Sequence, residues 1–167
     1  MWRTGLLWAA AVSAVGVMAS VGTTRVDGTS MQDTLFAGDR IVVLRTNSWP
    51  VRAVAGWLLG VQDVVVARDP SRAGAAVVKR IVAVGGDEVA VVNGHVTVNG
   101  KVPLLPNGSE PRSTWSADSR ADRVYVVPDN AYFLLADNRG TAVDSRVYGA
   151  VSRDGIIGMV IAILPRN

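Results

Sequence analysis

After Arg25, glycine, proline, asparagine and aspartate divide the chain into short runs of β-branched residues. These runs are shorter than most helices and match the usual length of strands, in which β-branched side chains are favoured. Where a two-residue turn such as Asn93-Gly94 separates two runs, the strands pair antiparallel. The sequence therefore predicts a mainly β domain built from antiparallel sheet. We expect strands at residues 41–44, 63–66, 76–82, 89–92, 95–98, 124–127 and 156–164.

Two dipeptides that favour tight hairpin turns follow one another, Asn93-Gly94 and Asn99-Gly100. They predict a small meander over residues 88–102. His95 follows the first turn and is expected at the surface of the hairpin. Residues 106–122 are rich in proline, serine, glycine and charge, which predicts an exposed loop.

An uncharged run of about 21 residues lies between Arg3 and Arg25, close to the ~20 residues with which a helix spans a bilayer. We expect residues 1–24 to form a cytoplasmic tip and a transmembrane anchor, with the N-terminus inside because Arg3 precedes the run. Residues 25–167 would then form a domain on the outer face. The alternative is a cleaved signal peptide, because Val17-Met18-Ala19 resembles a small-residue cleavage site.

A second apolar stretch, residues 49–60, contains Trp49 and Trp57 and is too short to span a bilayer. Two interpretations stay open for it. It could dip into the bilayer beside the anchor, or it could be packed into the core of the domain.

The composition excludes several kinds of chemistry. The absence of cysteine rules out disulfides, thiolate zinc sites, iron–sulfur clusters and cysteine nucleophiles. The single histidine, His95, rules out a multi-histidine metal site and leaves one imidazole for a Ser-His-Asp triad. Nucleophilic chemistry is therefore expected to use another base. The formal net charge of +3 is spread along the chain, which favours a membrane surface over nucleic acid as a partner.

Lys79 is a candidate for that base. Lys79 and Lys101 are the only lysines, and every other basic residue apart from His95 is arginine. In a strand over residues 76–82, Lys79 shares a face with Val77 and Ile81. Burial lowers the pKa of an ammonium group, whereas a guanidinium keeps its proton. The alternative is that Lys79 lies on an edge strand and that its side chain extends to solvent.

Two other segments carry residues with possible chemistry. Ser30 lies in a glycine-containing turn before a strand, where it is either an exposed nucleophile or an ordinary turn residue. Residues 136–146 follow an apolar run, and their acidic and basic side chains predict a loop braced by ion pairs. These charged residues are Asp137, Arg139, Asp144 and Arg146.

The segments around Ser30, Lys79 and Asp137 occur in one order along the chain, with a hairpin between the last two. Their motifs are Ser30-Met31 with Thr34-Leu35 and Gly38-Asp39, residues 78–82 with Gly86-Asp87, Asn99-Gly100-Lys101, Asp137-Asn138-Arg139 and Asp144-Ser145-Arg146. Together they resemble the type I signal peptidases, membrane-bound Ser-Lys proteases that remove signal peptides. The resemblance covers the anchor and nearly all of the remaining chain. The single anchor and the Asp-Gly-x-Ser-Met sequence resemble most the short Gram-positive-type members.

The resemblance implies that Ser30 attacks the scissile carbonyl, while unprotonated Lys79 takes the hydroxyl proton and returns it to the leaving amine. The backbone N–H of Ser30 would hold the oxyanion in a tight turn with Gly28. Some members add a hydroxyl two residues before the nucleophile, which Gly28 cannot supply. The substrate would bind as an added strand, with its small side chains in shallow pockets. The implied pocket residues are Met31, Leu35, Val77 and Val78.

The resemblance also implies structural bracing by charged residues near the site. Arg80 would pair with Asp137, and Asp144 with Arg146. Arg139 and Ser145 belong to the same C-terminal signature.

Three positions depart from the family pattern. Asp33 stands where proline is usual, and Ala136 where glycine is usual. Ala142 stands where a serine or threonine hydroxyl commonly helps to orient the lysine, so this chain lacks one group that supports the base.

The resemblance therefore implies a serine endopeptidase with one pass through the cytoplasmic (inner) membrane of a bacterium. Its partners would be the lipid bilayer and the signal peptides of secretory preproteins, cleaved after small-x-small motifs. It implies no cofactor, no metal and no nucleic acid, and a monomer. Two alternatives stay open. One is a weak or inactive relative that binds exported peptides by strand addition, which Ala142 and Asp33 favour, and the other is a Ser-Lys peptidase dedicated to one substrate.

Overall fold

The computed structural model describes residues 19–48, 51–92, 95–111, 123–140 and 142–166. Its helices are α2 (Val51–Leu58) and α3 (Ser145–Tyr148), with a 3₁₀ turn, η1 (Arg153–Gly155). Its strands are β1 (Val21–Arg25), β2 (Arg40–Arg45), β3 (Val64–Arg68), β4 (Ala76–Val84), β5 (Glu88–Val92), β6 (His95–Val98), β7 (Arg123–Val126), β8 (Ala131–Leu135), β9 (Val151–Ser152) and β10 (Ile156–Leu164).

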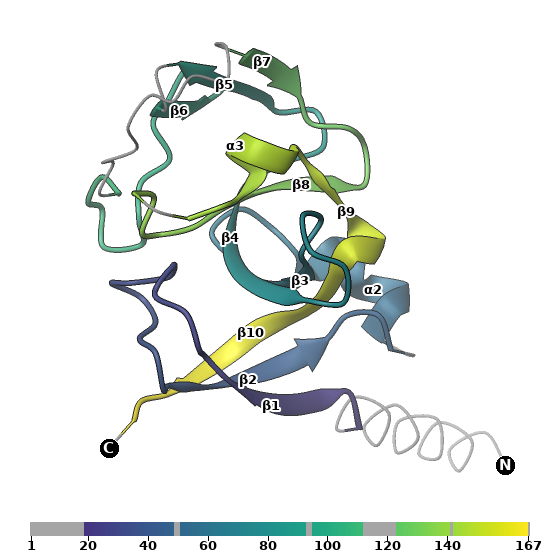
Figure 1. The fold of residues 1–167 in the computed structure, drawn as a ribbon. Coiled ribbons are helices and arrows are strands. Elements are labelled where there is room, and N and C mark those ends of the chain that lie inside the picture. Colours follow the sequence, from purple (N-terminus) through teal and green to yellow (C-terminus); the bar gives the residue numbers. More distant parts are fainter. Residues whose placement is uncertain (1–18, 49–50, 93–94, 112–122, 141, 167) are drawn as a thin grey trace, which may run out of the picture.

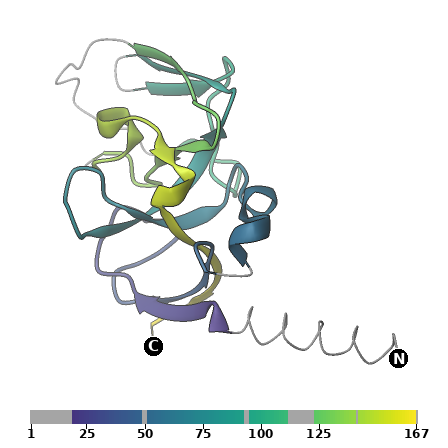
Figure 2. The ribbon, with the colours of Figure 1, turned by 90° about the vertical axis from the view of Figure 1, so that its right-hand side faces the viewer.

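The strands form two antiparallel sheets (Figure 1). The larger sheet has the order β1-β2-β10-β3-β4-β8-β9, and the smaller one has the order β6-β5-β7. Figure 2 shows the small sheet at one end of the molecule and β1 at the other. The mainly β, antiparallel architecture predicted from the sequence is confirmed.

Apolar residues of the strands fill three clusters of buried side chains. One joins the small sheet to β8 through Val89 and Phe133. A second lies on the large sheet around Val65 and Ile81. The third packs the segment after β1 onto β2 and β3. This third cluster fixes the position of the chain that contains Ser30.

The β domain begins earlier than the sequence predicted. β1 takes in the last four residues of the uncharged run and pairs with β2, from Val21 opposite Leu44 to Arg25 opposite Arg40. Its valine and threonines favour a strand. The uncharged run before β1 is then about 17 residues long, at the lower limit of the ~17–25 residues of a spanning helix.

The predicted anchor falls largely on residues 1–18, which lie outside the described residues. Within the described residues, no helix is both long and apolar enough to cross a membrane. The anchor therefore stays a prediction.

The second apolar stretch contains α2. Val51 and Leu59 are buried, whereas the side chain of Trp57 is 93% exposed. Trp49 lies outside the described residues. The stretch is therefore not a core segment along its whole length.

The predicted meander is only partly regular. β5 pairs with β6, and the second turn has Asn99 at φ 49° and Gly100 at φ 77°, as a tight hairpin turn requires. Beyond that turn a single bridge, Val98 to Lys101, continues the pairing. The third strand of the small sheet is instead β7. Pro103 has no N–H to donate to a ladder, which disfavours a strand directly after the turn.

The sequence also predicted a surface position for His95 and an exposed loop over residues 106–122. His95 is exposed at the start of β6. Residues 106–111 have no helix or strand, and residues 112–122, the rest of the predicted loop, lie outside the described part of the chain.

Candidate active site

Ser30 and Lys79 meet although 49 residues separate them in the sequence. Ser30 lies in the turn that follows β1, and Lys79 lies in the middle of β4. The Nζ atom of Lys79 is 3.1 Å from the Oγ atom of Ser30. The same Nζ donates a hydrogen bond of 3.1 Å to the carbonyl oxygen of Val78. A hydroxyl and an amine are thus in direct hydrogen-bond contact.

Lys79 is buried because of its place in the sheet. β4 lies between β3 and β8, and Lys79 stands opposite Val65 on β3. Only 3% of Lys79 is exposed, so the amine does not extend to solvent as the alternative interpretation required. Burial lowers the pKa of the Lys79 ammonium below its ordinary value of 10.5, while the carboxylates of Asp144 and Asp69 act in the opposite direction. An amine of this kind can accept a proton from a neighbouring hydroxyl.

The turn around Ser30 is held by its neighbours. Met31 and Leu35 are buried in the cluster with Ile41, and the N–H of Leu35 donates to the carbonyl oxygen of Met31 at 2.7 Å. The N–H of Asn138 donates to the carbonyl oxygen of Ser30 at 2.9 Å. The backbone of the serine is therefore fixed both by the core and by the loop after β8.

A cavity of about 200 Å³ opens beside the serine and the lysine. Two extended stretches, one after β1 and one at the start of β4, form its walls. The lining residues are Arg25, Val26, Asp27, Gly28, Ser30, Met31, Ala76, Val77, Val78 and Lys79.

Some of the predicted pocket residues line this cavity and one does not. Met31, Val77 and Val78 line the cavity. Leu35 is not among the lining residues, and its side chain is fully buried in the core cluster that also contains Met31. At Gly28 a Cβ atom would meet no atom within 4 Å, so the space where a hydroxyl could stand is open.

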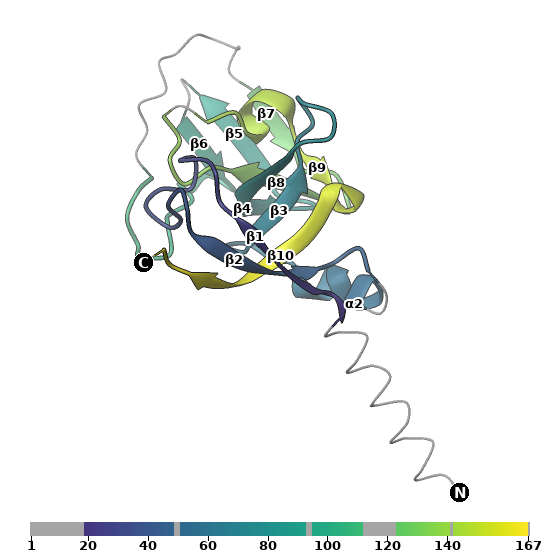
Figure 3. The same ribbon diagram turned by 60° about the horizontal axis from the view of Figure 1, so that its bottom comes forward.

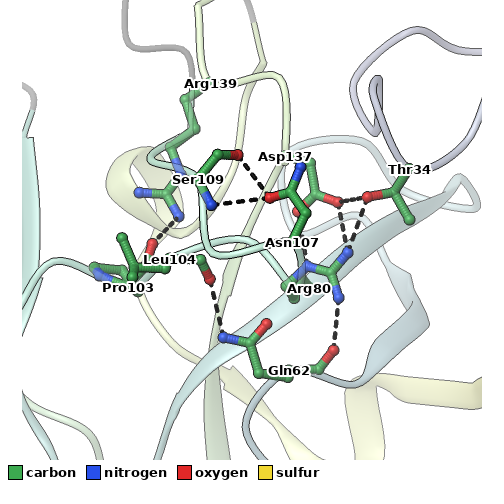
Figure 4. Close-up of polar contacts among 9 residues, drawn as sticks. All are labelled: Thr34, Gln62, Arg80, Pro103, Leu104, Asn107, Ser109, Asp137 and Arg139. Carbon is green, nitrogen blue, oxygen red and sulfur yellow. Dashed lines mark hydrogen bonds and ion pairs between the residues drawn. The ribbon is translucent and has the colours of Figure 1, made fainter.

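A buried ion pair connects the elements around the site (Figure 4). The guanidinium of Arg80 donates to both carboxylate oxygens of Asp137, at 2.8 and 2.6 Å. The hydroxyl of Thr34 donates to the same carboxylate, and Arg80 also donates to the carbonyl oxygen of Gln62 at 2.7 Å. The Arg80 and Asp137 side chains are 4% and 2% exposed. The pair thus joins β4, the turn after Ser30 and the loop after β8.

A second buried pair orders that loop. Asp144 caps α3, and its carboxylate accepts from Arg146 at 2.8 and 2.9 Å. Arg146 also donates to the carbonyl oxygen of Arg139 at 2.9 Å. The hydroxyl of Ser145 accepts from the N–H of Leu134 at 2.9 Å. These hydrogen bonds connect residues within the loop to one another and attach the loop to β8.

Arg139 is buried beside this pair. Its guanidinium donates to the carbonyl oxygen of Pro103 at 3.3 Å (Figure 4). Burial and the neighbouring Arg146 guanidinium lower the pKa of Arg139 to about 10. The contact connects the loop after β8 to the chain that follows the second hairpin.

Ala142 is buried and offers no side-chain hydrogen bond. Its carbonyl oxygen accepts from Arg146 at 3.4 Å. The neighbouring Thr141 lies outside the described residues. The hydrogen-bond partners of Lys79 given by the structure are therefore Ser30 and Val78.

Three features of the site were not found from the sequence. They are the contact of Thr34 with Asp137, the contact of Asn138 with Ser30, and the wall formed by residues 25–27. Thr34 and Asn138 lie within motifs, but a motif does not say which distant partner its side chains will meet. The wall could only have been found by predicting β1.

Comparison with known proteins shows the family of the chain. A family model described as "Signal peptidase, peptidase S26" matches residues 1–164. The chain belongs to this signal peptidase family. The family assignment made from the motifs is thus confirmed.

Curated signal peptidases are similar over most of this chain. A "Probable signal peptidase I-2" of Synechocystis sp. is 31% identical over 152 residues, which cover 89% of this chain and 66% of that protein. "Signal peptidase I U" of Bacillus subtilis is 31% identical over 137 residues, which cover 80% of this chain and 70% of that protein. The chain thus spans about two thirds of the length of these relatives.

Among solved structures, a crystal structure of a signal peptidase I from Enterococcus faecalis V583 matches with a TM-score of 0.47 and 23% identity. The match covers 61% of this chain and 96% of that chain.

Proposed function

We propose that this member of the signal peptidase family is a serine endopeptidase that removes signal peptides from exported preproteins after small-x-small motifs. Ser30 is the nucleophile and Lys79 the general base. The observation that carries the proposal is the 3.1 Å contact between the Lys79 amine and the Ser30 hydroxyl beside an open cavity. Such a pair can do acyl-transfer chemistry without a histidine.

The proposed reaction begins with neutral Lys79, whose burial favours the unprotonated amine. As Ser30 Oγ attacks the scissile carbonyl carbon, its proton passes to Lys79 Nζ. The tetrahedral oxyanion is stabilised by backbone N–H groups in the turn around Ser30. The C–N bond then breaks, Lys79 gives its proton to the leaving amine, and an acyl-Ser30 ester remains. Water attacks the acyl carbon as Lys79 accepts its proton. The bond from that carbon to Ser30 Oγ then breaks, Lys79 gives the proton to Ser30 Oγ, and the carboxylic acid product leaves the restored hydroxyl.

The proposed substrate binds as an added strand. β8 pairs with β4 only between Arg80 and Val84, so the edge of β4 from Ala76 to Lys79 has no β8 partner. This edge and residues 25–28 face the cavity. An extended peptide can pair with such an edge, and a cavity of about 200 Å³ suits small side chains near the cleavage site.

The proposed location is the cytoplasmic membrane of a bacterium, with one transmembrane segment, the N-terminus inside and the β domain, which begins with β1, outside. The uncharged run before β1 and the basic Arg3 support this topology. No cofactor is needed for the chemistry. The bilayer and the signal peptides of secretory preproteins are the proposed partners, and we propose a monomer.

Cleavage of a generic preprotein by the purified full-length chain in detergent tests the function. Wild type should release the signal peptide. Ser30→Ala and Lys79→Arg should abolish cleavage while keeping the fold, because arginine retains the charge but cannot act as a base. Lys101→Arg is the matched control and should cleave at the wild-type rate. Substantial activity of Lys79→Arg would refute the dyad.

A second candidate function rests on Ala142. Without a hydroxyl at this position the chain could be a relative that binds exported peptides by strand addition and does not cleave them. A peptide-binding assay combined with the cleavage assay separates the two functions. Binding of a signal peptide by the wild type without any cleavage would favour the binding protein.

A further inference from the structure

The helix α2 presents apolar side chains to the outside. Trp57 is 93% exposed, Leu58 is 40% exposed, and Val61 just beyond the helix is 48% exposed. A tryptophan is usually largely buried, because its ring is the largest apolar side chain. We call Trp57, Leu58 and Val61 the α2 apolar surface. Within the described residues it is covered by no other part of the chain.

The N-terminal end of α2 lies where the uncharged N-terminal run enters the domain, and the α2 apolar surface lies at the other end of this short helix. Ser48, just before α2, donates a hydrogen bond of 2.8 Å to the hydroxyl of Ser20, just before β1. The carbonyl oxygen of Ser20 accepts from the N–H of Arg45 at 2.8 Å, and that of Ser48 accepts from the N–H of Arg52 in α2 at 2.8 Å. Figures 1 and 3 likewise place α2 beside the start of β1.

Contacts with the rest of the domain fix the orientation of α2. Val51 and Leu59, at either end of the helix, are buried. Arg153 donates to the carbonyl oxygen of Arg52 at 3.0 Å. A Cβ atom added at Gly56 would lie 2.9 Å from the Arg153 guanidinium, so a glycine permits this close approach. The exposed tryptophan therefore sits on a helix that is fastened to the domain.

The charges around this junction are mainly positive. Arg45, Arg52 and Arg153 lie near it, and Arg52 contacts Asp154 at 3.2 Å. Near Val61, at the other end of α2, Asp63 accepts a hydrogen bond from the N–H of Gly60 at 2.8 Å, and Asp129 lines the same cavity as Val61. Basic side chains next to an exposed tryptophan are typical of helices that lie in the interface of a membrane with anionic lipids.

We infer that α2 is an interfacial helix that inserts its apolar surface into the headgroup region of the bilayer. It would lie beside the proposed anchor, with Trp57 as the deepest side chain. Its eight residues measure about 12 Å, too short to cross a bilayer but long enough to lie on one. The inference rests on the proposed membrane location, not on the proposed chemistry. It gives the domain a second point of contact with the membrane, which restricts rotation about the anchor.

The absence of cysteine makes a direct test possible. In the full-length chain, Trp57→Cys is labelled with the environment-sensitive fluorophore NBD and reconstituted into phosphatidylcholine–phosphatidylglycerol vesicles. The control is Val124→Cys, which is 66% exposed on β7 at the opposite end of the molecule (Figure 1). We expect a blue-shifted emission and quenching by brominated lipids at position 57, strongest for bromine at the depth of about 5–10 Å typical of interfacial helices. Position 124 should show neither.

Two results would overturn the inference. One is emission at position 57 like that at position 124, which means that the helix stays in water. The other is a blue shift without quenching by lipid, which means that the anchor or a second copy of the chain covers the surface. NBD-labelled Leu58→Cys repeats the emission and quenching measurements at a second position of the α2 apolar surface. The measurement uses no substrate, so a failure of the peptidase proposal leaves its outcome unaffected.

Discussion

Lys79 is the residue on which the proposed chemistry depends, and within the described part of the chain its amine has two hydrogen-bond partners. Its amine contacts Ser30 Oγ and the Val78 carbonyl oxygen, each at 3.1 Å. Ala142 contributes only a methyl group. An amine with fewer partners spends less time in the geometry that proton transfer needs. The wild type is therefore expected to be a slow enzyme.

The Ala142→Ser variant should increase kcat and leave KM nearly unchanged, because the new hydroxyl would contact the base and not the substrate. One added hydrogen bond of about 0.5–1.5 kcal/mol corresponds to roughly two- to tenfold in rate. Steady-state kinetics on a soluble peptide measure both constants. An unchanged kcat would count against this argument, and loss of activity in Thr141→Val would then identify Thr141 as the source of the hydroxyl.

Burial of Lys79 should also reduce stability. Its pKa is lower in the folded protein than the 10.5 of a free lysine, so between these two values the unfolded chain binds more protons. The free energy of unfolding of the wild type therefore rises with pH across this window. Lys79→Met removes the titrating group and should raise Tm, most at low pH and least near pH 10. Calorimetry at about pH 6 and about pH 9.5 measures this. A Tm below wild type at both pH values would contradict it.

At the scale of elements, the buried Arg80–Asp137 pair links parts of the chain that are distant in sequence. It connects β4, the turn that contains Ser30 and the loop after β8, and it is almost completely buried. A buried charge that loses its partner is costly, whereas an exposed ion pair contributes little. The exposed pair between Arg52 and Asp154 is a matched comparison, with side chains 63% and 78% exposed.

Asp137→Ala should therefore lower the free energy of unfolding by about 3–5 kcal/mol. Asp154→Ala should change it by less than about 1 kcal/mol. Denaturant titration of both variants measures the difference. Equal effects would show that the buried pair does not brace the fold.

The sequence predicted the strands better than it predicted their arrangement. Local patterns located β4 and β10 within two residues of their observed ends. They could not show that β10 inserts between β2 and β3, because pairing across the sheet depends on distant residues. β1 was missed since its residues continue an uncharged run. The short helix α3 was missed as well, because four residues carry little helical periodicity.

The candidate site was predictable where a residue type was unusual in its context. Lys79 stood out as a lysine in an apolar strand of a chain whose basic residues are almost all arginine. For Leu35 the sequence does not distinguish a side chain that lines a pocket from one buried in the core, and the structure places it in the core cluster beside Met31. The hydrogen bond from the N–H of Asn138 to the carbonyl oxygen of Ser30 could be found only from the three-dimensional structure.

At the scale of the whole molecule, the proposed nucleophile is close to the proposed anchor. Ten residues separate Ser20 from Ser30, so these residues can be at most about 35 Å apart. β1 fixes the first half of this distance by pairing with β2. The site would therefore stay near the membrane surface, where signal peptides emerge.

Deleting residues 1–18 should lower cleavage of membrane-inserted precursors more than cleavage of soluble peptides. The anchor raises the effective concentration of the site at the bilayer, and the chemistry itself does not require it. Parallel assays on a precursor in vesicles and on a soluble peptide measure the two rates. Equal losses on both substrates would mean that the segment acts on the fold and not on membrane placement.

The central claim is that Lys79 activates Ser30, and the rate at which a serine-directed acylating inhibitor modifies the full-length protein tests it most directly. Mass spectrometry of the wild type should locate the acyl group on Ser30, at a rate that rises with pH through a pKa below 10.5. Lys79→Arg should show no acylation, and Lys101→Arg should match the wild type. Acylation at another residue, or an unchanged rate in Lys79→Arg, would contradict the account.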